Sequence, residues 1–294
     1  MVIFYLITII LGRTLQGIFY KPASSSMPNA RTYIGFTSFQ FLCTGIPCFL
    51  LIIFSGGLKI DLLTLGLATS LGLCMLLGGF CSLFAMKSGT VSLSSMFSSA
   101  GLIVPLIAGI ILFGQPIRLL QWFGVGLFFV SSYFLIGSSK KIYTNFSFKT
   151  IFLLIGSLLF SGGSALSQQL FTYYVPDGDI TVFTFLSFIV TSALGAIVCL
   201  FTKNKEQNIS LDKRSFKALT VCGIALGVAI FLINLSATAL TKLISPVILF
   251  TFANGSFTII STLFGAVLYK EKITLQSVIG IILGIASLVI IKLF

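Results

Sequence analysis

The sequence predicts an all-α integral membrane protein built from ten transmembrane helices. Ten apolar stretches of about 17 to 25 residues occupy nearly all of the chain, and each is long enough to cross the ~30 Å hydrocarbon core. Only 8% of the 294 residues are charged, 57% are hydrophobic, and the mean hydropathy is +1.13. The stretches are continuous apolar runs rather than the ten-residue alternations of a transmembrane β-barrel, so each must satisfy its backbone as a helix.

In chain order, the predicted spans are residues 2–20, 33–55, 62–86, 91–113, 119–137, 150–171, 181–202, 217–240, 245–268 and 274–293. The first is a span rather than a signal peptide, because Met1 to Tyr20 has no basic n-region and no small-residue cleavage site. Turn-forming or polar residues separate the spans, most clearly at Lys21-Pro22, Gly56-Gly57, Gln115-Pro116, Pro176-Asp177-Gly178 and Lys203 to Arg214.

Basic residues are distributed unequally between the two sides of the predicted membrane protein. The loops after the first, third, fifth, seventh and ninth spans hold thirteen Lys and Arg residues, and the opposite side holds four. The positive-inside rule puts the thirteen in the cytoplasm and both termini outside. The same rule accounts for the net charge of +12, so nucleic acid is not an expected partner.

Two segments that lie 156 residues apart share a pattern. Gln115–Gly124 reads QPIRLLQWFG and Glu271–Gly280 reads EKITLQSVIG, and a Gly-containing apolar span follows each. Five spans repeated once must place the two halves in opposite orientation, because five is odd. The predicted architecture is therefore two inverted five-helix repeats, residues 1–140 and 149–294, with the substrate site where the halves meet.

The ten-span count, the five-plus-five repeat and the turn before the last span of each half resemble the drug/metabolite transporter superfamily, specifically its ten-span EamA-like members. The family's turn reads Gly-Glu, whereas this chain has Gly114-Gln115 in one half and Lys270-Glu271 in the other. The resemblance implies a central cavity lined by spans 1, 3, 4, 6, 8 and 9, with spans 5 and 10 at the periphery. It also implies cytoplasmic termini, against the charge distribution, so both orientations remain open.

Arg13 is the only charged residue well inside a predicted span, where a charge costs about 2.5–3.5 kcal/mol on insertion scales. Arg13, Gln16, Gly17 and Tyr20 follow the i, i+3, i+4, i+7 spacing of one helix face. In one interpretation, Arg13 faces a cavity and pairs with an anionic or carboxylate-bearing substrate. In the other, its side chain extends to the membrane interface, roughly 10 Å away.

Other polar side chains inside the predicted spans complete a candidate substrate site. With Arg13 and Gln16, the candidate substrate-binding residues are Gln40, Ser95, Ser99, Gln168, Asn234 and Asn254. Serine at helical spacing is also typical of close helix packing, as are Gly223xxxGly227 and Gly280xxxGly284. Gln and Asn are costlier to bury, which favours a cavity-lining position for the three residues of these types in the second half.

The sequence argues against catalysis, metal binding and proton coupling. None of the six acidic residues lies inside a predicted span, and the chain has no histidine, so neither a proton relay nor an activated nucleophile is expected. The six cysteines lie in apolar runs without CxxC spacing, which is typical of small core residues rather than of metal ligands or disulfides. No cofactor, metal or enzymatic activity is therefore predicted.

These observations favour a secondary transporter in the bacterial cytoplasmic membrane. The prediction is a facilitator or exchanger that moves a small polar metabolite, such as an amino acid, by alternating access. Its expected partners are that metabolite and the membrane lipids, and the protein would be a monomer or a homodimer. Two alternatives remain: an exporter of amine, quaternary ammonium or drug-like compounds, held by some of the 31 Phe and 8 Tyr residues, and a lipid flippase of the same superfamily.

Overall fold

The computed structural model describes residues 2–27, 29–55, 60–88, 91–113, 119–142, 147–201, 213–241 and 274–293, together with 260, 264, 267, 268 and 270. These residues contain helices and no strand, which confirms the all-α prediction for the described part of the chain. In order, the helices are α1 (Val2–Ser25), α2 (Ala30–Ser55), α3 (Leu62–Ser88), α4 (Val91–Ser99), the 3₁₀ turn η1 (Ala100–Leu102), α5 (Ile103–Phe113), α6 (Leu119–Ile142), α7 (Phe148–Tyr174), α8 (Ile180–Phe201), α9 (Lys213–Thr241) and α11 (Leu275–Leu293).

Long apolar helices dominate the described residues. Six contain stretches long and apolar enough to cross a membrane: Val2–Ser25, Arg31–Phe54, Leu62–Met86, Phe148–Tyr174, Ile180–Phe201 and Ser215–Asn234. Shorter apolar stretches occur at Leu93–Pro105, Trp122–Leu135 and Leu275–Ser287. Every predicted span except 245–268 coincides with a helix or a helix group, and most of 245–268 lies outside the described residues.

Two of the differences from the predicted boundaries involve proline. The helix α1 continues through Pro22 to Ser25, although a turn was expected at Lys21-Pro22. Pro22 lies in the last turn, where the lost N–H removes only one bond near the helix end. The single predicted helix 91–113 is instead interrupted by η1, because Pro105 has no N–H for the carbonyl of Gly101 and its ring crowds that carbonyl.

The turn before α11 contains a residue in the left-handed region. Lys270 has φ of 52°, a conformation that glycine adopts without steric cost. In the EamA-like turn that the sequence resembles, this position carries Gly, so Lys270 has a conformation suited to the residue type that it replaces.

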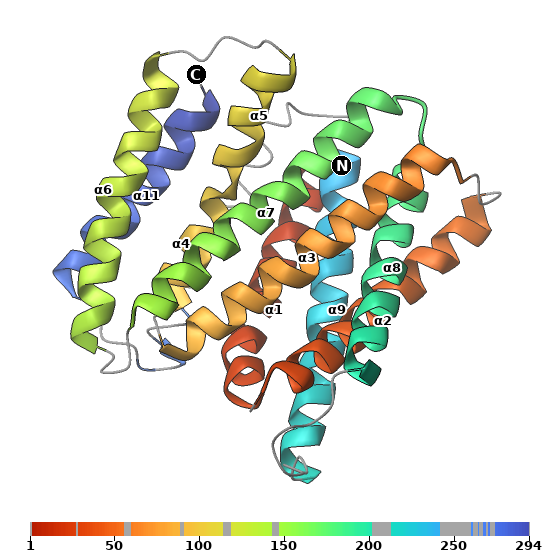
Figure 1. Ribbon diagram of the computed structural model, residues 1–294, viewed down its shortest axis with the longest axis horizontal. Helices are drawn as coiled ribbons and strands as arrows, with labels where there is room; N and C mark the ends of the chain where they lie inside the picture. Colours follow the sequence, from red (N-terminus) through yellow and green to blue (C-terminus); the bar gives the residue numbers. More distant parts are fainter. Residues whose placement is uncertain are drawn as a thin grey trace.

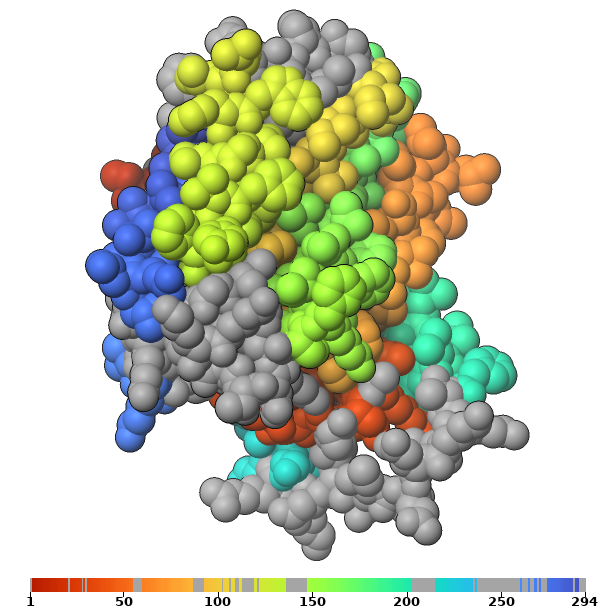
Figure 2. Space-filling view, turned by 60° about the vertical axis from the view of Figure 1, so that its left-hand side comes forward, coloured from red at the N-terminus to blue at the C-terminus, as the bar shows by residue number. Residues whose placement is uncertain are grey.

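The helices pack in a small number of long pairings. The closest pairs are α3 with α7, α1 with α9, α2 with α8, and α6 with α11, and α3 also packs on α8 as α2 does on α9. In Figure 1, α3 and α7 run side by side through the centre of the molecule, while α6 and α11 form a pair at one side. The same α6–α11 pair lies on the outer surface in Figure 2.

Small residues allow these helices to approach closely. Gly12 of α1 lies against Ala229 and Ile233 of α9, where an added Cβ would be 2.6 Å from Ile233 Cγ1. Gly227 of α9 lies against α2, with a Cβ position 2.9 Å from the carbonyl oxygen of Gln40. Ser131 Oγ of α6 donates to the carbonyl of Gly280 in α11 at 2.6 Å. Small residues at helix interfaces are the usual means of tight packing within a membrane.

Candidate functional site

A polar cavity of about 290 Å³ lies among the central helices, lined by residues of α1, α2, α3, α4, α7 and α9. Its polar lining residues are Arg13, Gln16, Tyr20, Tyr33, Thr37, Gln40, Ser82, Ser98, Ser99, Ser157, Ser161, Ser164, Gln168 and Asn234. Helices α1, α3, α4, α7 and α9 correspond to spans 1, 3, 4, 6 and 8, as the family resemblance implies. The contribution of α2 was not expected from that resemblance, and span 9 lies mostly outside the described residues.

The side chains of α1 form a hydrogen-bonded row along the cavity. Arg13 Nη1 donates to Gln16 Oε1 at 2.8 Å, and Gln16 Nε2 donates to the hydroxyl of Tyr20 at 3.3 Å. These three of the four residues predicted to share a face line the cavity. Gly17, expected on the same face, instead lies against Phe264, with a Cβ position 3.0 Å from Phe264 Cδ2.

Two glutamine side-chain amides in the cavity make no hydrogen bond with the described residues. Gln40 is only 5% exposed. Its backbone carbonyl oxygen accepts a hydrogen bond from Thr44 Oγ1 at 3.1 Å, and this bond leaves the side-chain amide unused. Gln168 likewise accepts from Thr172 Oγ1 through its backbone carbonyl, at 3.0 Å. Both side-chain amides line the cavity, and each retains donors and acceptors for a ligand.

The serines of the cavity wall are instead engaged with one another. Ser98 Oγ of α4 and Ser157 Oγ of α7 are 2.7 Å apart, and Ser161 Oγ donates to the carbonyl of Ser98 at 2.7 Å. Ser164 Oγ donates to the carbonyl of Ser161 at 2.7 Å. These bonds join α4 to α7 and account for the polar stripe of α7 as helix packing that also borders the cavity.

Six of the eight candidate residues meet in this cavity, namely Arg13, Gln16, Gln40, Ser99, Gln168 and Asn234. Asn234 Nδ2 donates to the carbonyl of Ile230 on its own helix, at 2.9 Å. Ser95 is 0% exposed and is not among the lining residues. Asn254 lies outside the described residues.

The cavity also contains polar residues that the sequence reasoning missed. Tyr33 and Thr37 of α2 line it with Gln40, and the Tyr33 hydroxyl donates to the carbonyl of Leu76 at 2.9 Å. The three residues follow i, i+4, i+7 spacing, which is the signal that could have revealed them. Tyr33 is the first residue of the predicted span 33–55, and an aromatic residue at a span end is typical of the membrane interface rather than of a substrate site.

The electrostatic character of the cavity is set by one cation. Arg13 is the only charged residue among the described residues that line it, and none of those residues is Asp or Glu. A guanidinium in a low-dielectric cavity attracts a carboxylate strongly and can bind both of its oxygens. The arrangement therefore suits an anionic group of a ligand and disfavours a cationic one.

Comparisons with known proteins agree with this fold. The sequence model of the EamA-like transporter family matches residues 148–293. A solved structure described only as "Crystal structure of protein" is 14% identical in sequence, with a TM-score of 0.64, and the match covers 99% of this chain and 96% of that one. At this identity, the likeness concerns the fold alone. No curated protein sequence matches the chain.

Proposed function

Because its second half carries the EamA-like domain, the chain belongs to the EamA-like transporter family, and we propose that it is a secondary transporter of a small, carboxylate-bearing polar metabolite, such as an amino acid or a related solute. Membership makes it a multi-pass integral membrane protein of the drug/metabolite transporter type, in keeping with the six span-length apolar helices among its described residues. The family is one of transporters, which favours transport over an enzymatic activity. The proposed location is the bacterial cytoplasmic membrane.

The proposed architecture is ten spans arranged as two inverted five-helix repeats, residues 1–140 and 149–294. The helix pairings support it. In this arrangement α1, α2 and α3 of the first half correspond to α7, α8 and α9 of the second. The α3–α7 pair is then equivalent to the α9–α1 pair, and the α3–α8 pair is equivalent to the α9–α2 pair. The α2–α8 and α6–α11 pairs then join equivalent helices. Such exchange of partners is what a pseudo-two-fold axis between the halves produces.

The observation that carries the proposed substrate class is the position of Arg13. Its side chain lines a cavity whose other described lining residues are uncharged. A carboxylate of the ligand would accept paired hydrogen bonds from the guanidinium, whose donors form a planar fork. Halves rocking about this cavity would expose it alternately to the two sides of the membrane.

The rings of Tyr20, Tyr33 and Phe41 also line the cavity, and they are the observation that favours the alternative of an amine or quaternary ammonium substrate. Arg13 stands in the same cavity and would repel such a cation. The cavity therefore supports an anionic substrate better. A lipid flippase remains the second alternative, for which a bound headgroup phosphate would take the place of the carboxylate at Arg13.

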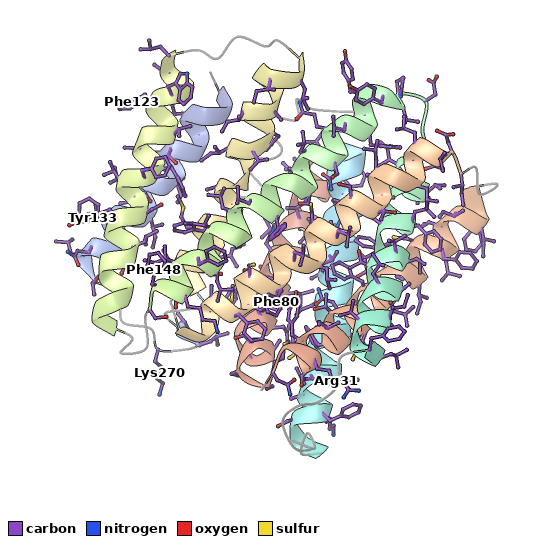
Figure 3. All side chains as sticks on the ribbon, viewed as in Figure 1. Arg31, Phe80, Phe123, Tyr133, Phe148 and Lys270 are labelled. Carbon is purple, nitrogen blue, oxygen red and sulfur yellow. The ribbon has the colours of Figure 1, made fainter. Side chains whose placement is uncertain are left out.

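The proposed orientation keeps the basic side in the cytoplasm. Arg31, in the first turn of α2, and Lys270, before α11, come from opposite halves of the sequence and lie at the same end of the molecule (Figure 3). Phe123, near the start of α6, lies at the opposite end. Thirteen basic residues on the Arg31 side are the reason for assigning that side to the cytoplasm.

The test is uptake of radiolabelled carboxylates into proteoliposomes that contain wild-type protein or an Arg13 variant. Arg13→Ala should lower uptake about 10- to 150-fold, which corresponds to one lost charge-assisted interaction of about 1.5–3 kcal/mol. Arg13→Lys should lie in between, because lysine keeps the charge but not the planar fork. Lys149→Ala is the control, since Lys149 is exposed at the start of α7 and outside the cavity lining. Normal uptake by Arg13→Ala would overturn the proposal.

A further inference from the structure

Two of the helix faces that line the cavity have the same spacing of lining residues along the sequence but carry different charges. On α1, the lining residues Arg13, Gln16 and Tyr20 follow i, i+3, i+7. On α7, Ser161, Ser164 and Gln168 line the cavity with the same spacing. The first face carries a positive charge, and the second has only hydroxyl and amide groups.

Helix α3 packs against both α1 and α7, the helices that carry these two faces. One side of α3 meets α7, where a Cβ on Gly78 would be 3.2 Å from Phe160 Cβ. The adjacent position, Gly79, meets α2 on the other side, with a Cβ position 2.8 Å from the Tyr33 hydroxyl. Through these contacts α3 joins the helices that line the cavity, and it contributes Gly78 and Gly79 to the lining itself.

Among the three residues of the α7 face, only Gln168 has uncommitted hydrogen-bond donors. Ser161 and Ser164 donate to the carbonyls of Ser98 and Ser161. The Gln168 amide makes no hydrogen bond among the described residues. The amide of Gln40, on α2, is likewise uncommitted among the described residues, although that residue is only 5% exposed. An amide offers both donors and an acceptor but no charge.

We propose that the cavity binds its substrate in one orientation, with a carboxylate at Arg13 and an uncharged hydrogen-bonding group at Gln168. The substrate class is then an acid whose distal end is an amide or hydroxyl, rather than a second carboxylate or an ammonium group. This inference rests on the proposed function and adds the identity of the distal group. Gln168 is its specificity-determining residue.

The physical reason is the cost of burying an uncompensated charge. A distal carboxylate would leave water without gaining a cation on α7, and a distal ammonium would do so without gaining a carboxylate. A distal amide can exchange two hydrogen bonds with an uncharged amide side chain. A site built for hydrogen bonding rejects unsuitable groups more strongly than an apolar pocket does.

Matched acids of three to six carbons provide the test. Each acid carries an amide, a carboxylate, an ammonium or a methyl group at its distal end, as in succinamate, succinate, 4-aminobutanoate and butanoate. Binding is measured on the purified full-length protein by thermal stabilisation and by competition for uptake. Wild-type protein should bind the best amide at least tenfold more tightly than any of the other three types.

Charge changes at residue 168 should redirect this preference. Gln168→Arg should favour the dicarboxylates, Gln168→Glu should favour the ω-amino acids, and Gln168→Leu should remove the preference for amides while retaining carboxylate binding. The control is the next residue, since Gln169 is half-buried but outside the described cavity lining. Gln169→Arg and Gln169→Glu should leave the wild-type order unchanged.

The outcomes separate this inference from the proposed function. If acids bind in an Arg13-dependent way but all distal groups bind equally, or if the residue 168 variants keep the wild-type order, the assignment of Gln168 is wrong and the proposed function stands. If no acid binds, or if binding survives Arg13→Ala, the proposed function fails and this inference fails with it.

Discussion

A methyl group at Gly162 should force apart the helices that hold the serine wall of the cavity. Gly162 of α7 lies directly against η1 and the start of α5, where an added Cβ would overlap the carbonyl oxygen of Gly101 and the side chain of Val104. The contact is mutual, since a Cβ on Gly101 would be 2.6 Å from the backbone nitrogen of Gly162 and 2.9 Å from the carbonyl oxygen of Leu158. Normal carbon contacts are about 3.5–4.0 Å, so Gly162→Ala requires a separation of about 1 Å.

The cost follows from the kind of atoms that oppose the methyl group. Backbone atoms of two helices cannot rotate away, so the substitution is an overpacking change that costs about 1–3 kcal/mol. For a chain of this size, that corresponds to a fall of roughly 2–12 °C in Tm. The Ser161–Ser98 and Ser98–Ser157 hydrogen bonds, both 2.7 Å, lie beside the contact and would lengthen. Gly162→Ala should therefore weaken substrate binding as well as stability.

Thermal unfolding in detergent can be followed with a thiol-reactive dye, because Cys48 and Cys222 are buried and become reactive on unfolding. Gly66→Ala and Gly126→Ala are matched controls, since an added Cβ at either position meets nothing within 4 Å. Both should leave Tm unchanged or raise it, because alanine is the better helix former. A Gly162→Ala protein as stable as these two would refute the argument that the Gly101–Gly162 contact sets the helix spacing.

Four further predictions concern reactivity, backbone strain, orientation and coupling. Cys74 lines the cavity, so a variant that retains it as the single cysteine should react with a small thiol reagent, and bound substrate should slow that reaction. A variant that retains only the buried Cys48 should not react. Equal labelling of the two variants would contradict the placement of Cys74 in the cavity lining. Lys270→Gly should raise stability by about 0.4–1 kcal/mol by relieving the positive φ of 52°, and a lower Tm would count against that reason. A cysteine at Asn208, in a cysteine-free background, should resist impermeant reagents added outside intact cells, and labelling there would show the reverse orientation. Uptake should not respond to an imposed pH gradient, since the predicted spans contain no Asp, Glu or His; accumulation driven by protons alone would show that coupling exists.

The positions of most helices could be predicted because the bilayer imposes a minimum apolar length on each span. The predicted 150–171 and 181–202 correspond to Phe148–Tyr174 and Ile180–Phe201. The interruption of the fourth predicted span could not be located from hydropathy, because η1 is as apolar as its flanks and depends on the local effect of Pro105. The C-terminal end of α1 lies beyond the predicted residue 20, because a proline in the last turn of a helix is tolerated.

The candidate site was predictable along a helix but not between helices. Arg13, Gln16 and Tyr20 share a face because helical geometry is fixed, and the structure keeps them together. Ser95 and Ser99 are one turn apart on α4, yet only Ser99 lines the cavity, because the depth at which the cavity ends depends on the neighbouring helices. The part played by α2 likewise depends on its packing against α8 and α9.

Hydrogen-bond satisfaction separates the structural from the functional polar residues of this cavity better than residue type alone. The serines on α4 and α7 donate to one another or to carbonyls of the adjoining helix, so their polarity is used to join helices. The amides of Gln40 and Gln168 gain no such bond from the described residues, although they border the same cavity. A polar group that is held away from bulk water without a partner destabilises the protein, and a ligand that binds both amides would remove that cost. The two glutamines are therefore the positions at which substitution should alter substrate binding more than stability, and serine substitutions should do the opposite.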